Sequence, residues 1–219
     1  MKILSIDIGG SHVKALLTGA KERRRFESGP DMTPKKMVAE VKTLCEGWSW
    51  DAVSIGYPGV VKDGKIAKDP ANLGRGWVGF DFAKAFGCPA AVVNDAAMQA
   101  LGSYDGGRML FLGLGTGLGT AMVAEGHLMP MELAHLPYRK GRTYEEYVGE
   151  AARKRMGSQK WEKHVFAVIE LLRAALGPDE VVLGGGNARR LDKLPKGVRL
   201  GENANAFVGG FRLWKSDRA

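Results

Sequence analysis

Two glycine-rich turns are the residues of this sequence that most directly suggest chemistry. The first is Gly9-Gly10-Ser11, which follows a run of apolar residues and Asp7, and the second is Gly115-Thr116-Gly117. Such turns present backbone N–H groups with no Cβ in the way, which suits an oxygen-rich anion such as phosphate. Ser11 and Thr116 add hydroxyl donors. Because Asp7 would repel a bare phosphate, we expect a Mg²⁺ ion or ordered water between the two.

An amide and a carboxylate follow the apolar start of VVNDAAM, residues 92–98. Asn94 and Asp95 are residue types that cap helices, so a structural role is one interpretation. The other is catalytic, because a carboxylate at the carboxyl end of a buried strand is well placed to act as a general base. The two interpretations are compatible, and both stay open here.

Other polar and small residues suit ligand binding. Glu132 and His135 lie three apart in MELAHL and suit hydrogen bonds to a polyhydroxylated substrate, although an ordinary surface glutamate and a satisfied histidine explain the spacing equally well. Residues 184–186 form a third glycine-rich turn, before a predicted helix, against which an adenosine could lie. Asn72 and Trp77, in the loop ANLGRGW, either bind a ligand or stabilise the loop.

The segments that carry the first two turns repeat each other. Residues 110–126 resemble residues 4–20 at an offset of 106, which places Gly115 on Gly9 and Ala121 on Ala15. Alternating apolar residues on both sides of each turn predict antiparallel strands. A third strand is expected in each copy, at residues 23–28 and 127–133.

Helices and buried strands follow each repeat. Thr33 and Pro34 are typical of the start of a helix that ends near Gly47, and Thr143 with Glu146 predicts a capping box for a helix over 144–156. A further helix carries apolar residues at helical spacing from Trp161 to Leu176 and ends at Gly177-Pro178. Short buried strands are expected at 52–59, 90–96 and 180–186. The pattern predicts a duplicated α/β fold with domains at 1–105 and 106–219 that pack around a shared cleft.

Composition narrows the class of protein. The net charge of +8 is concentrated in basic clusters such as residues 21–26 and 138–142, which favours a polyanionic partner. No helix-turn-helix, zinc-finger or RNA-binding motif accompanies these clusters, so specific nucleic-acid binding is not expected. Cys45 and Cys88 lack metal or disulfide spacing, and we find no signal peptide or membrane-spanning stretch. We therefore expect a cytoplasmic protein without a membrane partner.

Seven motifs in order, from DIGGSHVK through GYPGVV, ANLGRGW, VVNDA, GLGTGLGTAMV and ELAH to LGGGNARR, resemble the ROK family of sugar kinases, and within it the polyphosphate glucokinase branch. The resemblance implies an actin/hexokinase-like (ribonuclease H-like) fold with a central cleft between two domains. It implies Asp95 as the catalytic base. The sugar ligands it implies are Gly59, Asn72, Asn94, Glu132 and His135. The phosphate or nucleotide ligands it implies are Asp7, Gly9, Gly10, Ser11, Lys14, Gly115, Thr116, Gly117, Gly185 and Gly186.

The implied activity is Mg²⁺-dependent phosphoryl transfer from polyphosphate, ATP or both to the 6-hydroxyl of a hexose, with glucose as the first candidate. Alternatives are an ATP-dependent kinase for fructose or mannose, and a catalytically weak sugar-binding sensor. Many ROK kinases carry a cysteine-rich zinc motif, and no cysteine follows Cys88 here, so zinc is not expected. Ala134 stands where the family usually has glycine, and its methyl group could shift His135. A homodimer is expected because homodimers are common in the family.

Overall fold

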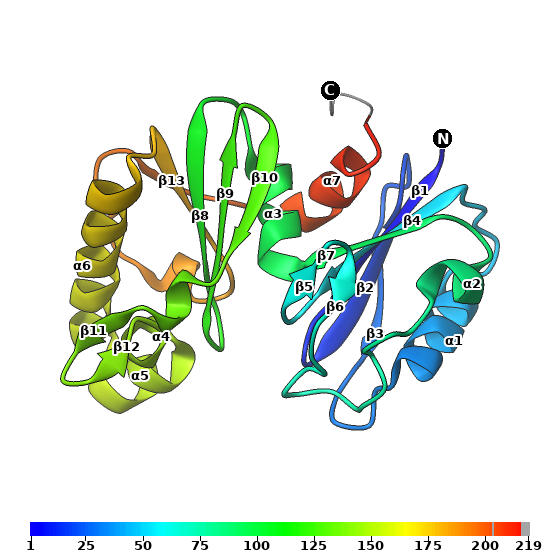
Figure 1. Cartoon of the computed structure of the whole chain (residues 1–219), viewed down its shortest axis with the longest axis horizontal. Helices are drawn as coiled ribbons and strands as arrows, with labels where there is room; N and C mark the ends of the chain where they lie inside the picture. The colour runs from blue at the N-terminus through cyan, green and yellow to red at the C-terminus, as the bar shows by residue number, and fades with distance from the viewer. Residues whose placement is uncertain (203, 216–219) are drawn as a thin grey trace. The chain divides into compact units, whose positions relative to one another are not determined.

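The computed structural model describes residues 1–202 and 204–215, and these form two compact units that are described separately (Figure 1). The first unit comprises residues 1–98 and the segment from Ala206 onward, and the second comprises residues 99–205. The sequence predicts a division at 105/106 and so assigns everything after it, including residues 206–215, to the second domain. In the structure the chain returns to the first unit after Asn205. Residues 216–219 lie outside the described part.

The first unit is built on a five-stranded sheet with the order β3-β2-β1-β4-β7. The strands are β1 (Ile3–Ile8), β2 (His12–Leu17), β3 (Arg24–Glu27), β4 (Ala52–Tyr57) and β7 (Ala90–Asn94). The first three strands are antiparallel neighbours, whereas β1, β4 and β7 run parallel to one another. Strands β1 and β4 are buried along their whole length, as expected of central strands in an α/β layer. A two-stranded ribbon, β5 (Val61–Lys62) and β6 (Lys65–Ile66), follows β4.

The helices of the first unit begin at side-chain caps. Helix α1 (Pro34–Leu44) starts at Thr33, whose side chain accepts the N–H of Lys36, as predicted. The short helix α2 (Phe82–Phe86) starts in the same way at Asp81 and ends at Gly87, whose φ of 74° is left-handed. Buried residues of α1, including Met37 and Val41, join Leu4, Ile6 and Ile55 of the sheet in one apolar core.

Helix α7 (Asn205–Arg212) completes the first unit through small residues. The Ser54 hydroxyl donates to the carbonyl of Gly210 at 2.6 Å, and Trp214 Nε1 donates to Ser54 Oγ at 2.8 Å. A Cβ at Gly210 would meet Ser5 Oγ, so this position accepts only glycine at the present spacing. The contact joins residues about 160 positions apart, which is why no local pattern predicts it.

The second unit repeats the sheet order of the first, as β10-β9-β8-β13-β14. Its strands are β8 (Arg108–Leu114), β9 (Leu118–Ala124), β10 (His127–Met131), β13 (Glu180–Gly184) and β14 (Val198–Leu200), with a separate ribbon of β11 (Pro137–Arg139) and β12 (Arg142–Thr143). Strands β8, β13 and β14 are parallel, and β8, β9 and β10 are antiparallel neighbours. The predicted third strands are therefore confirmed as β3 and β10.

The repeat is one residue out of step after its turn. Four residues separate the paired positions Ile8 and Val13, whereas three separate Leu114 and Leu118. The offset is therefore 106 before the turn and 105 after it, so Ala15 corresponds to Thr120 rather than to the predicted Ala121. The shift arises because the second turn is shorter.

The long helix α6 (Ser158–Leu176) runs along one face of the second sheet (Figure 1). Its buried residues, among them Trp161, Val165 and Ile169, pack with Leu110 and Val181 of the sheet. It ends at Gly177 with a left-handed φ of 57°, as predicted. Within the residues that the structure describes, no helix has the length and apolar character needed to cross a membrane.

Two helix predictions for the second unit were wrong. The expected helix over 144–156 divides into α4 (Glu145–Val148) and α5 (Glu150–Met156), because Gly149 is extended with ψ of 170°. A Cβ at Gly149 would lie 2.7 Å from the carbonyl oxygen of Thr116, so the break lets the backbone approach the second glycine turn. The helix expected after Gly186 is a single 3₁₀ turn, Ala188–Arg190, and the N–H of Asn187 before it donates to the carbonyl of Leu114. Helix α3 (Asp95–Ser103) contains the division between the two units.

Candidate active site

The parallel strands of the first sheet bring its predicted site residues to one edge. Strand β1 ends before the turn at residues 9–11, β4 ends before Gly59, and β7 ends at Asn94. Cross-strand pairing places Asp7 beside Gly56, and Gly56 beside Val93. With neighbouring strands about 4.8 Å apart, Asp7 and the end of β7 are roughly 10 Å apart. Carboxyl ends of parallel strands are where α/β proteins commonly bind their ligands.

Asp7 makes an ion pair across the first hairpin. Its carboxylate accepts from Lys14 Nζ at 3.1 Å, and the Asp7 residue is only 8% exposed. The two residues are direct cross-strand partners on β1 and β2. The sequence led us to expect Mg²⁺ or water beside Asp7, and the structure adds a lysine that already balances its charge.

The first glycine turn is open to solvent on one side. The N–H of Gly9 donates to the carbonyl of His12 at 2.9 Å, and Ser28 Oγ donates to the carbonyl of Gly9 at 2.6 Å. Gly10 and Ser11 are exposed. A Cβ at Gly10 would lie 3.4 Å from Cβ of Asn72, so the structure places this predicted sugar residue beside the turn.

Asn94 has the structural role that the sequence left open. Its Oδ1 accepts the N–H of Ala97 at 3.1 Å, which caps helix α3, and its Nδ2 donates to the carbonyl of Gly59 at 3.0 Å. The residue thereby fixes the loop after β4 to the end of β7. Asp95 follows as the first residue of α3, half-buried, with Oδ1 accepting the N–H of Ala96 at 2.8 Å.

Trp77 stabilises its loop. It is fully buried, its Nε1 donates to Gly74 at 2.8 Å, and its N–H donates to Asp69 at 2.8 Å. Its ring packs 5.6 Å from that of Tyr57, and a Cβ at Gly59 would lie 2.9 Å from the same tyrosine ring. These contacts favour the structural interpretation of Trp77, while the neighbouring Asn72 remains exposed.

The second unit likewise gathers its predicted residues at one sheet edge. Strands β8, β13 and β10 share a direction, so the turn at 115–117, the turn at 185–186 and the start of the Glu132 segment follow carboxyl ends on the same side. Gly185 has φ of 80°, and a Cβ there would meet the carbonyl oxygen of Leu114. Only glycine fits this close approach.

Three residues that the sequence analysis missed surround the second glycine turn, two through side chains and one through its backbone N–H. The carboxylate of Glu145 accepts the N–H of Leu118 at 3.1 Å and lies against Gly117. The N–H of Glu150 donates to the carbonyl of Gly115 at 3.0 Å, and Asn187 Nδ2 donates to the same carbonyl at 3.2 Å. A glycine in the middle of a helical pattern, Gly149, was the available signal.

Glu150 is held in its charged form. Hydrogen bonds from Arg153 and Asn187, together with the charges of Arg153 and Lys154, lower the pKa of its carboxyl to about 2. Arg153 contacts it with two nitrogens at 2.8 Å each. The residue whose backbone N–H supports the second turn therefore carries a carboxylate that stays ionised well below neutral pH.

Glu132 and His135 lie on a short 3₁₀ turn that β9 braces. Thr120 Oγ1 donates to the carbonyl of Met131 at 2.7 Å and accepts the N–H of Leu133 at 3.1 Å. Glu132 Oε2 and His135 Nε2 are 3.8 Å apart, and both side chains are more than half exposed. Ala134 points the other way, since it is 3% exposed and belongs to the apolar core.

Among the described residues, no three histidine, cysteine, aspartate or glutamate side chains come together in a group that could hold a metal ion. Mg²⁺ usually binds through one or two carboxylates together with substrate phosphates. Asp7 is one such carboxylate, and it fits an arrangement in which the ion arrives with its phosphate ligands.

Comparisons with known proteins agree with this architecture. The chain is 29% identical to a polyphosphate glucokinase of Mycobacterium tuberculosis over 225 residues, covering 93% of this chain and 83% of the relative. Its structure is similar to that of an inorganic polyphosphate/ATP-glucomannokinase from Arthrobacter sp. strain KM, with a TM-score of 0.81, 24% identity and coverage of 95% and 96%. It is also similar to a ROK family glucokinase from Streptomyces griseus in complex with glucose and AMPPNP, with a TM-score of 0.78, 17% identity and coverage of 97% and 99%. These likenesses confirm the hexokinase-like α/β fold. The ROK family model matches residues 3–130, more than half of the chain, and the protein therefore belongs to the ROK family.

Proposed function

We propose that this protein is a sugar kinase that transfers a phosphoryl group from polyphosphate, ATP or both to the 6-hydroxyl of a hexose, with glucose as the preferred acceptor. The similar proteins named above are a polyphosphate glucokinase, a polyphosphate/ATP-glucomannokinase and a glucokinase, which supports a sugar acceptor and both kinds of donor.

The observation that carries the proposal is the position of Asp95. Its carboxylate follows the carboxyl end of β7, two strands from the glycine turn after β1, and Asn94 fixes the intervening loop. In the proposed reaction Asp95 accepts the proton of the sugar 6-hydroxyl. The sugar oxygen forms a bond to the terminal phosphorus while the bond from that phosphorus to the donor breaks. A positioned base contributes about 10²–10⁴-fold to such a step.

Charge on the transferred group must be neutralised, because phosphoryl transfer depends mainly on positioning and electrostatics. The N–H groups of residues 10–11 and 116–117 would supply donors, since those of Gly9 and Gly115 already donate within their own turns. Lys14 would supply a positive charge. Gly185 and Gly186 would lie against the adenosine when ATP is the donor. A Mg²⁺ ion bound with the donor phosphates would neutralise further charge, and Asp7 is the residue that would hold it directly or through water.

Sugar recognition is assigned to residues of both units. Gly59, Asn72 and Asn94 would bind hydroxyl groups from the first unit, and Glu132 and His135 from the second. The exposure of Glu132 and His135 supports this assignment, because their polar atoms are available to a ligand. Thr120 holds the start of their 3₁₀ turn through Met131 and Leu133, which limits the ordering that binding must supply.

The test is formation of hexose 6-phosphate with Mg²⁺, comparing polyphosphate with ATP as donor and glucose with mannose and fructose as acceptor. Asp95→Asn should lower kcat by at least about 10²-fold while glucose binding, measured by calorimetry, is retained. Asp192→Asn is the matched control, because it removes the same charge from an exposed loop.

The proposal is supported if the wild-type chain phosphorylates sugar, Asp95→Asn loses this activity and Asp192→Asn keeps it. A chain that binds sugar and phosphorylates none of the three with either donor contradicts it and favours a sensor. An Asp95→Asn variant with undiminished kcat excludes Asp95 as the base.

A further inference from the structure

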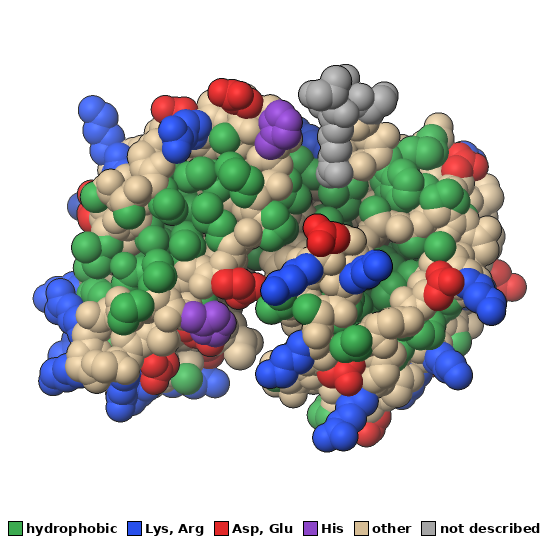
Figure 2. Space-filling model, viewed as in Figure 1, with side chains coloured by type: hydrophobic (Ala, Val, Ile, Leu, Met, Phe, Trp, Pro, Cys, Tyr) green, Lys and Arg blue, Asp and Glu red, His purple; other side chains and the backbone are tan. Residues whose placement is uncertain are grey.

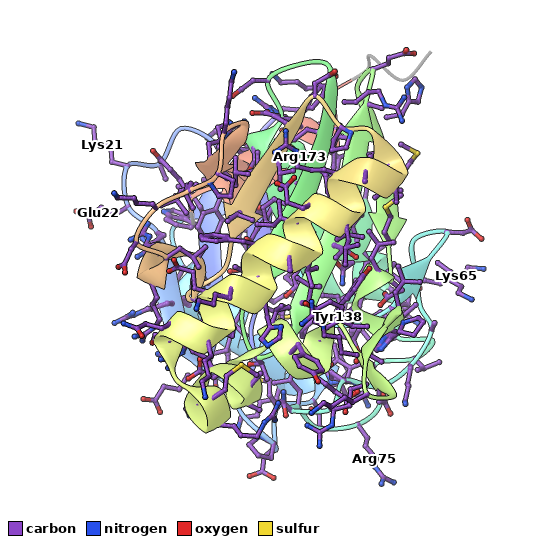
Figure 3. The ribbon with its side chains drawn as sticks, turned by 90° about the vertical axis from the view of Figure 1, so that its left-hand side faces the viewer. Lys21, Glu22, Lys65, Arg75, Tyr138 and Arg173 are labelled. Carbon is purple, nitrogen blue, oxygen red and sulfur yellow. The ribbon has the colours of Figure 1, made fainter. Side chains whose placement is uncertain are left out.

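A basic pocket in the second unit has no role in the reaction as proposed so far. Its volume is about 440 Å³. It lies where β11, the end of α5 and the first half of α6 meet, and Figure 3 shows Tyr138 against this part of α6. Its lining residues are Tyr138, Arg139, Met156, Lys160, Lys163, His164 and Ala167.

Aromatic packing makes one wall of the pocket rigid. The ring of Tyr138 packs edge-on against Tyr144 at 5.5 Å, Tyr147 at 5.0 Å and His164 at 5.7 Å. Tyr138 OH is also 3.2 Å from Nδ1 of His164. The wall therefore keeps its shape before any ligand binds, which lowers the entropic cost of binding.

The pocket carries three cations and no carboxylate among its lining residues. None of the ion pairs found in residues 1–202 and 204–215 involves Arg139, Lys160 or Lys163. The guanidinium of Arg139 lies 5.0 Å from the centre of the Tyr138 ring instead. Lysine and arginine side chains gather along the outer edge of this unit, at the lower left of Figure 2. Unpaired cations around a concave surface attract polyanions.

The environment of the pocket also affects the pKa of His164. Burial and the charge of Arg139 lower its pKa, so the imidazole is neutral at pH 7. The charged and titratable groups around it are Arg139 and Tyr138 from β11, Tyr147 from α4, and Lys160 and Lys163 from α6. An anion in the pocket would favour the charged imidazolium and raise this pKa.

Helix α5 connects the pocket to the second glycine turn. The N–H of Glu150, at its first residue, donates to the carbonyl of Gly115, and Met156, at its last, lines the pocket. At 1.5 Å per residue the helix spans about 9 Å. A chain of several phosphates can bridge such a distance, whereas a single orthophosphate cannot.

We propose that this pocket binds a phosphate polyanion and holds the distal part of a polyphosphate chain whose terminal phosphate lies at residues 115–117. The inference rests on the proposed function, which it deepens by assigning residues that distinguish polyphosphate from ATP. Lys160, Lys163 and Arg139 supply the charge, and His164 supplies a neutral N–H donor. When a polyanion binds to cationic side chains, counterions are released into solution. Because that release is less favourable in concentrated salt, binding weakens as the salt concentration rises.

The first experiment measures binding of long-chain polyphosphate by calorimetry, without sugar. Lys160→Glu/Lys163→Glu should weaken binding roughly tenfold or more and make it less sensitive to salt. Lys35→Glu/Lys36→Glu, on the exposed first turn of α1, changes the net charge equally and should leave affinity within about twofold of wild type. Adding polyphosphate to the wild-type chain should also raise the pKa of His164 in an NMR titration. Orthophosphate at equal phosphate concentration should not.

Equal weakening in both double variants, or undiminished binding in Lys160→Glu/Lys163→Glu, overturns the proposal. In turnover assays the same variant should lower kcat/KM with polyphosphate and leave kcat/KM with ATP within about twofold; an equal fall with both donors also overturns it. If the wild-type chain phosphorylates no sugar, the proposed function fails, and the binding measurement alone decides the pocket.

Discussion

The two glycine hairpins share a backbone plan and differ in what surrounds it. At the first, the second cross-strand pair from the turn is Asp7 and Lys14, and the turn itself is exposed. At the second, the corresponding pair is Gly113 and Gly119. There the carbonyl of Gly115 accepts the Glu150 N–H and the Asn187 side chain, and the Glu145 carboxylate binds Leu118 N–H.

The comparison shows two ways in which duplicated turns can diverge. The first turn carries a charged pair of side chains, whereas the backbone of the second is enclosed by neighbouring groups. The first turn can change its electrostatics with a single substitution and keep its shape. The second depends on close backbone approaches at Gly149 and Gly185, where an added Cβ would meet a carbonyl oxygen. Substitutions in either turn can break this contrast.

Gly185→Ala should be the most damaging change to the second turn. Its φ of 80° is strained for alanine, and the new methyl group would meet the carbonyl of Leu114, which no side-chain movement relieves. We expect a loss of about 3 kcal/mol or more in the free energy of unfolding, measured by urea denaturation. Gly186→Ala is the control, because a Cβ there contacts nothing within 4 Å. Similar stability of the two variants would show that the second turn is not enclosed.

Lys14→Met tests the charged turn. It leaves the carboxylate of Asp7, 8% exposed, without its cation, which should cost about 1–3 kcal/mol of unfolding free energy at pH 7. Asp7→Asn/Lys14→Met removes both charges and should recover part of that loss. If the single and double variants are equally stable, the pair does not set the stability of the first hairpin.

Gly117→Ala and Gly115→Ala compare two positions of one turn. A methyl group at Gly117 meets the Glu145 carboxylate, whereas one at Gly115 contacts nothing within 4 Å. Because the glutamate can move, we expect only about 1 kcal/mol of destabilisation for Gly117→Ala and less for Gly115→Ala, measured by thermal unfolding. Glu145→Ala in the same chain should relieve most of the Gly117→Ala effect. Additive effects of the two substitutions would place Glu145 away from the turn.

Acid should weaken the second hairpin through Glu150. Its pKa is lowered from an ordinary value of 4.5 to about 2, so the folded state favours the charged carboxylate. The resulting stability is present above pH 4.5 and is lost as the pH falls from 4.5 towards 2. Glu150→Gln should therefore flatten the pH dependence of the unfolding midpoint in this range. Glu40→Gln, at an exposed position of α1, is the charge control. An unchanged profile in Glu150→Gln would contradict the assignment.

Local patterns predicted the strands and most helix ends, because alternation, caps and terminal glycines act over a few residues. Thr33, the Thr143–Glu146 capping box and Gly177 all have the predicted roles. The break at Gly149 was missed because its cause is the carbonyl of Thr116, which only the fold brings near. Glu145 and Asn187 were missed for the same reason.

The candidate site likewise has features that the sequence predicted and features that only the fold shows. Residues on strands and turns, such as Asp7 and Asn94, were recognised because their types are unusual at the end of an apolar run. Lys14 lies beside Asp7 because β1 pairs with β2 in this register. The sequence predicted that the two strands pair, but not their register. The turn lengths, four residues against three, fix that register, and they depend on how each turn closes.

Helix α7, from Ala206 onward, belongs to the first unit although it follows the second unit in the chain. Its contacts with Ser54 require residues 210 and 214, and more than 100 residues of the second unit intervene. At a synthesis rate of about 5–20 residues per second, the ribosome needs roughly 5–20 s to cross that stretch. During this time the second unit can fold while the Ser5 and Ser54 face of the first lies uncovered. The first unit is thus incomplete until residues 206–214 have been synthesised.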